Sequence, residues 1–238
     1  MYIKESCTAF CDRLKRDFST GCLPEEPTLT VAPHGKLDER GILTPFSGTT
    51  VVWELSPQER AELIRLQREI AYPCLKILGS QRLPSDSLHV TLHDLISTEG
   101  TSTASPEAMD RLEQARLVLS QATDALRKPI ALRSWRMVSM VSKSIVLLLT
   151  PETVDDWERL STLYDELQAV VPLDYPATPH ITLGYYRPGV HDTSAIRDAI
   201  DIPCSGKRFV LRPESLMLQR FSDMAHYYTV APAFPDRA

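Results

Sequence analysis

The sequence lacks the features that would place it in a membrane or in an oxidising compartment. No apolar run reaches 18 residues, so no transmembrane helix is expected. Residues 1–7 lack the apolar core of a signal peptide. The five cysteines are odd in number and contain no Cys-x-x-Cys pair, which predicts reduced thiols. We therefore expect a cytoplasmic protein with no membrane partner.

The chain also lacks a surplus of positive charge. It has 26 Lys and Arg against 31 Asp and Glu, a net charge of −5. This balance argues against a broad basic surface for long nucleic acids and leaves open a local pocket for a small nucleotide or an RNA terminus. With 238 residues, 43% of them hydrophobic, the chain is long enough for one domain or two intimate lobes. A monomer is expected.

One short pattern occurs twice, 91 residues apart: Leu88-His89-Val90-Thr91-Leu92 corresponds to Pro179-His180-Ile181-Thr182-Leu183. In a β-strand, residues i and i+2 point to the same face, so each histidine projects beside its threonine. Two such strands facing each other would place two imidazoles and two hydroxyls around one cleft. Those groups are suited to metal-free acid–base chemistry on a phosphodiester.

The segments that precede the pattern are repeated as well. Strand-like runs over 49–55 and 144–149 lead into Ser56-Pro57-Gln58-Glu59 and Thr150-Pro151-Glu152-Thr153. Both are interpreted as helix starts with a cap, a proline and an acid. The chain therefore contains a duplicated strand–helix–strand unit, which an accidental tripeptide would not bring with it. A third copy, His191-Asp192-Thr193, follows Pro188-Gly189 and is assigned to a turn outside the site.

The remaining segments complete an α+β prediction. The fold is expected to be two pseudo-symmetric lobes, each a small, mostly antiparallel sheet with outer helices and an active cleft between them. Residues 1–34 are predicted to form an N-terminal helix, over about 2–18, and an extended segment, and 35–238 to form the bilobal domain. Further elements are expected as a hairpin over 36–46, a helix over 106–128, and strands over 133–141, 209–218 and 226–231.

The two motifs, in this context, resemble the two-histidine (2H) phosphoesterase superfamily, which includes LigT-like RNA phosphoesterases and cyclic phosphodiesterases. The resemblance covers the chain from about Gly35 to its end. The stretch 35–52, together with 87–91, is most similar to a poorly characterised branch of that superfamily. The resemblance implies that His89, Thr91, His180 and Thr182 lie in the active site. The two copies differ where His93 takes the place of Gly184.

Roles follow for the polar and aromatic residues of the two strands. His89 and His180 are the expected catalytic residues, and Thr91 and Thr182 are expected to donate hydrogen bonds to nonbridging phosphate oxygens. By strand parity, His93 is expected at the cleft edge, contacting substrate or solvent, and Tyr186 at the rim, stacking on a base. Tyr185 is expected to point into the core. Core packing is also expected for Phe46, Trp135, Tyr227 and Tyr228, and for these four a place in the pocket wall is the alternative.

The favoured mechanism needs no metal and no cofactor. One neutral imidazole takes a proton from the attacking water or hydroxyl, and the other, protonated, gives one to the leaving oxygen. By resemblance the substrate is a 2′,3′-cyclic phosphate, a 2′–5′ linkage or a small cyclic nucleotide such as ADP-ribose 1″,2″-cyclic phosphate, with reverse ligation of RNA ends open to the same chemistry. Two alternatives remain: a non-catalytic nucleotide- or RNA-binding module, and a zinc hydrolase using His89, His93 and His180.

Overall fold

A computed structural model describes residues 4–122 and 124–233 and confirms the α+β architecture. The helices are α1 Cys7–Phe18, α2 Pro57–Ala71, α3 Pro106–Gln121, α4 Val154–Gln168 and α5 Thr193–Ile200, with short 3₁₀ turns at Ser85–Ser87 and Pro213–Ser215. The strands are β1 Thr28–Val31, β2 Phe46–Glu54, β3 His89–Glu99, β4 Ile130–Met140, β5 Ser144–Pro151, β6 His180–Tyr185, β7 Gly189–Asp192, β8 Arg208–Leu211, β9 Leu216–Phe221 and β10 Tyr227–Pro232.

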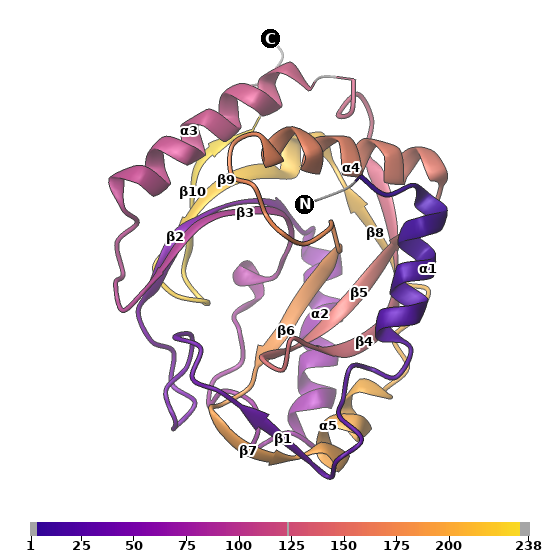
Figure 1. The fold of residues 1–238 in the computed structure, drawn as a ribbon, viewed down its shortest axis with the longest axis vertical. Coiled ribbons are helices and arrows are strands. Elements are labelled where there is room, and N and C mark those ends of the chain that lie inside the picture. Colours follow the sequence, from indigo (N-terminus) through magenta and orange to yellow (C-terminus); the bar gives the residue numbers. More distant parts are fainter. Residues whose placement is uncertain (1–3, 123, 234–238) are drawn as a thin grey trace.

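Two four-stranded antiparallel sheets form the two lobes (Figure 1). One has the strand order β10-β9-β2-β3 and the other β6-β5-β4-β8. The strands that carry the two His-x-Thr motifs, β3 and β6, are each the edge strand of their sheet and contact one another. The site therefore lies where the two sheets meet, as expected for a duplicated unit. A third, two-stranded sheet pairs β1 with β7.

The helices cover the two sheets, and α3 and α4 run side by side along one border of the molecule (Figure 1). The predicted start of α2 is confirmed: Ser56 accepts from the Glu59 backbone N–H and Glu59 reciprocates, a complete capping box. The start predicted at Thr150 is wrong. Pro151 ends β5, and α4 begins at Val154, with the Thr153 hydroxyl as its cap.

The N-terminal helix docks against the second lobe. Phe10 is fully buried and stacks on Trp157 of α4 at 3.9 Å between ring centroids. Arg13 is held by Glu5 at 2.8 Å and donates to the Ala177 carbonyl, also at 2.8 Å. The helix begins at Cys7 rather than near residue 2, and residues 2 and 3 of the predicted span lie outside the described residues.

Other boundaries differ modestly from the sequence expectations. Helix α3 ends at Gln121 rather than near 128, and the closing strand expected over 209–218 is divided into β8 and β9 by a 3₁₀ turn. The hairpin expected over 36–46 is reduced to a tight turn with a single bridge between Leu37 and Leu43. Among the described residues, no helix combines the length and apolarity needed to cross a membrane.

Candidate active site

The four motif side chains line one cavity between the lobes. His89 and Thr91 come from β3, His180 and Thr182 from β6, and the cavity they share has a volume of about 310 Å³. All four residues are partly exposed. Because each motif strand lies at the edge of its sheet, its side chains reach the space between the lobes.

A β-bulge follows each motif threonine. In β3, Thr91 lies opposite Val52 and His93 opposite Val51, so Leu92 is left without a partner. An extra residue in one strand reverses the alternation of side chains beyond it. The residue that rejoins His89 and Thr91 on the cleft face is therefore Asp94, not His93.

The second motif strand carries the same irregularity. Thr182 lies opposite Val146 and Gly184 opposite Ile145, so Leu183 is the extra residue of β6. Tyr185 consequently shares the cleft face with His180 and lines the cavity. Tyr186, expected at the rim of the cleft, is instead fully buried and takes no part in the cavity wall. Tyr185, expected in the core, takes the place in the wall.

His93 is turned away from the cavity into the protein interior. It is 1% exposed, its Nδ1 lies 2.7 Å from the Asp94 carbonyl, and its ring packs at 5.0 Å from that of Tyr164. The expected place of His93 at the cleft edge is wrong, because the bulge moves it to the core face of β3. It does not join His89 and His180 as a third zinc ligand. Within 4–122 and 124–233, no group of three His, Cys, Asp or Glu side chains is placed to hold a metal ion.

Each catalytic candidate faces a backbone carbonyl two residues before it. His180 Nδ1 lies 2.7 Å from the Thr178 carbonyl, which makes Nδ1–H the donor and leaves Nε2 as the free acceptor of the neutral ring. The equivalent carbonyl for His89 is that of Ser87, which partly opposes the lowering of the His89 pKa by burial. Its geometry falls short of a hydrogen bond, so His89 Nδ1 is buried and unpaired.

Burial lowers the pKa of both histidines. Loss of hydration brings the pKa of His89 down to about 4, although the Asp94 carboxylate opposes the change. The pKa of His180 is lowered for the same reason, with opposition from the Thr178 carbonyl and Asp94 and a smaller lowering contribution from Lys36. Both rings are therefore neutral in the empty site at neutral pH.

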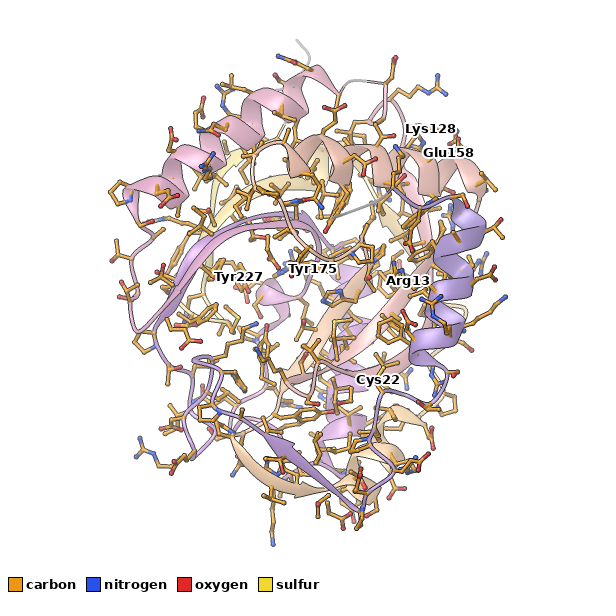
Figure 2. The ribbon with its side chains drawn as sticks, in the orientation of Figure 1. Arg13, Cys22, Lys128, Glu158, Tyr175 and Tyr227 are labelled. Atoms are coloured by element: carbon orange, nitrogen blue, oxygen red, sulfur yellow. The ribbon has the colours of Figure 1, made fainter. Side chains whose placement is uncertain are left out.

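A lysine and several aromatic residues complete the walls. The Lys36 ammonium lies 4.7 Å from the Tyr185 ring centre and 5.4 Å from that of Phe46. Tyr227 meets His89 edge-on at 4.7 Å between ring centroids. Tyr227 and Tyr175, labelled in Figure 2, both line the cavity.

Sequence reasoning missed most of these wall residues. Phe46 and Tyr227 take the pocket role that was only the alternative for them, whereas Trp135 and Tyr228 lie outside the cavity wall. No pattern in the sequence singled out Lys36, Asp94 or Tyr175. The bulge of β3 carries no glycine or turn residue that would have revealed the position of Asp94, whereas Gly184 adjoins the bulge of β6.

The third His-x-Thr copy is remote from this chemistry. His191 lies in β7, not in a turn, and its Nε2 is 2.7 Å from the Arg187 carbonyl. Asp192 caps α5, and Thr193 is its first residue. None of the three lines the cavity of the two motif strands.

Comparison with solved structures shows a shared fold. The conserved protein of unknown function ATU0111 from Agrobacterium tumefaciens matches with 16% identity over 92% of this chain and 98% of that one, at a TM-score of 0.63. TT0787 of Thermus thermophilus matches with 17% identity over 77% and 95%, at 0.51. LigT of E. coli matches with 18% identity over 78% and 95%, at 0.48. No family model and no curated protein sequence matches the chain.

Proposed function

We propose that this protein is a metal-independent phosphodiesterase that acts on a nucleotide or an RNA-end phosphodiester by two-histidine acid–base catalysis. The observation that carries the proposal is the convergence of His89, Thr91, His180 and Thr182 from two equivalent edge strands on one cavity. Two imidazoles and two hydroxyls are the groups that such a cleavage requires.

In the proposed reaction one ring accepts a proton and the other donates one. One neutral histidine accepts a proton at Nε2 from water, whose oxygen forms the new bond to phosphorus. The other histidine, protonated, donates from Nε2 to the leaving oxygen as its bond to phosphorus breaks. Thr91 and Thr182 donate their hydroxyl hydrogens to the nonbridging oxygens, where negative charge grows in the transition state. A ribose hydroxyl in place of water gives a transfer by the same steps.

Binding of the substrate allows one of the two rings to take up a proton. In the empty site both rings are neutral because burial lowers their pKa values. An anionic phosphodiester placed between them raises those values, since an adjacent negative charge favours the imidazolium. One histidine is then protonated from solvent, and the site holds one acid and one base.

A substrate panel tests the proposal. Nucleotides with 2′,3′-cyclic, 2′–5′ and 3′–5′ phosphodiesters are incubated with the protein in EDTA, and products are separated by chromatography. We expect turnover of a cyclic or 2′–5′ phosphodiester in EDTA and its loss in His89→Ala. Absence of any turnover would favour the non-catalytic nucleotide-binding alternative, and activity restored only by zinc would favour a metal hydrolase.

A further inference from the structure

The two lobes present different chemistry at equivalent positions of the cavity. Asp94 follows Thr91 and Tyr185 follows Thr182 by the same three residues, each just beyond a bulge. The motif residues are otherwise matched pair by pair. Asp94 and Tyr185 are therefore where the pseudo-symmetry of the site is broken.

The Tyr185 side holds the cavity's positive charge. Lys36 is the only Lys or Arg among the described residues that line the cavity. Its ammonium lies over the rings of Tyr185 and Phe46, which belong to different lobes. Cation–π contacts with two rings restrict the ammonium to the wall of the cavity. Lys36 is therefore a fixed cation for a phosphate group.

The Asp94 side holds a negative charge, and Asp94 forms no salt bridge with the residues that the structure describes. Asp94 is the only Asp or Glu among the described lining residues, and it is exposed. Its oxygens contact two hydroxyls, those of Tyr175 and Thr50, each at 3.4 Å. A carboxylate in this place repels any phosphate that enters the cavity, and the repulsion grows with the charge of the phosphate.

We propose that Lys36 and Asp94 together set the charge that the cavity accepts, so that it binds singly charged phosphodiesters and rejects doubly charged phosphomonoesters. The inference rests on the proposed function and names its substrate class. The opposite charges of Lys36 and Asp94 cancel. The single negative charge of a diester is then balanced by the one proton that the two histidines take up. A monoester carries a second charge near neutral pH. The Asp94 carboxylate repels this second charge, and the repulsion speeds release of a monoester product.

Competition between two matched ligands tests the inference. A nucleoside 3′-monophosphate, mostly a dianion at pH 7 because its second pKa is about 6, is compared with its 3′-methyl ester, a monoanion. Both are measured as competitors in initial-rate assays of the substrate turned over, and their binding is measured by calorimetry. In the wild type we expect the diester to bind roughly tenfold tighter than the monoester. Asp94→Asn is expected to strengthen monoester binding by roughly tenfold and to change diester binding by less than about threefold.

Two further variants control the comparison. Asp174→Asn removes a neighbouring exposed carboxylate that does not line the cavity, and it should leave both affinities unchanged. Lys36→Met should weaken both ligands, and the doubly charged monoester more than the singly charged diester. If Asp94→Asn still cleaves a phosphodiester but its ratio of diester affinity to monoester affinity equals that of the wild type, the inference is overturned and the proposed function stands. If neither ligand binds and no phosphodiester is cleaved, the inference and the proposed function fall together.

Discussion

The Lys36 ammonium lies 4.7 Å from the centre of the Tyr185 ring and joins the loop before β2 to the second motif strand. This contact depends on the bulge at Leu183, because only the shifted register brings Tyr185 to the cavity. The positive charge of the site is thus positioned by a backbone irregularity in the opposite lobe.

Replacing Tyr185 should separate the role of its ring from that of its hydroxyl. Tyr185→Leu removes one face of the cation–π contact and should raise KM roughly fivefold, in line with about 1 kcal/mol for such a contact. Tyr185→Phe keeps the ring and should stay within about twofold of wild type. Steady-state kinetics on the substrate turned over would measure both, and equal losses in the two variants would point to the hydroxyl instead.

Loss of either cavity histidine should remove most of the activity. His89→Ala and His180→Ala are each expected to lower kcat/KM by roughly 10²–10⁴-fold, the usual range for a general acid or base. His191→Ala is the matched control, because it removes a histidine from the third motif copy outside the cavity. A large loss in that control would show that the second motif had been assigned wrongly.

The pH dependence of kcat/KM should be bell-shaped and displaced to the acidic side. One ring must be neutral and the other protonated, and in the free enzyme both pKa values lie below the ordinary histidine value, that of His89 at about 4. Activity at low substrate should therefore fall as pH rises through neutrality. The limbs of kcat should lie at higher pH, since the bound phosphate raises the pKa of both rings.

The same profiles give a second comparison. Asp94 raises the pKa of both histidines, so Asp94→Asn should move both limbs of kcat/KM to lower pH. Rates are measured from pH 4 to 9 in buffers of constant ionic strength. A flat wild-type profile, with the chemical step shown to limit the rate, would rule out two-histidine catalysis.

Acidification should destabilise the fold through His89. Because its pKa is about 4 in the folded protein and near the ordinary value when unfolded, the unfolded state binds more protons between these two values. Stability should therefore fall as pH decreases from about 6.5 to about 4, by at most about 3.5 kcal/mol, because a pKa difference of one corresponds to about 1.4 kcal/mol. Urea unfolding at pH 7 and pH 4.5 measures the loss. His89→Gln should show a smaller loss, whereas His191→Gln should behave as wild type.

The sequence by itself determined the duplicated plan of the protein. Alternating apolar and polar residues around His89 and His180 predicted two motif strands, and Ser56-Pro57-Gln58-Glu59 predicted the start of α2 because a capping box is a local interaction. The motif side chains needed only the two-residue period of a strand to share a face. These features depend on neighbours in the chain, and local physical rules are sufficient to identify them.

Tertiary structure decided what lies beyond each motif threonine. The bulge at Leu92, which arises from pairing with β2, turns Asp94 rather than His93 toward the cavity. The bulge at Leu183, which arises from pairing with β5, does the same for Tyr185 rather than Tyr186. In β3 no residue of the strand's own sequence marks the extra residue, and in β6 only Gly184 hints at it. Lys36 likewise reaches the cavity through packing against rings from two lobes, a contact that no local period encodes.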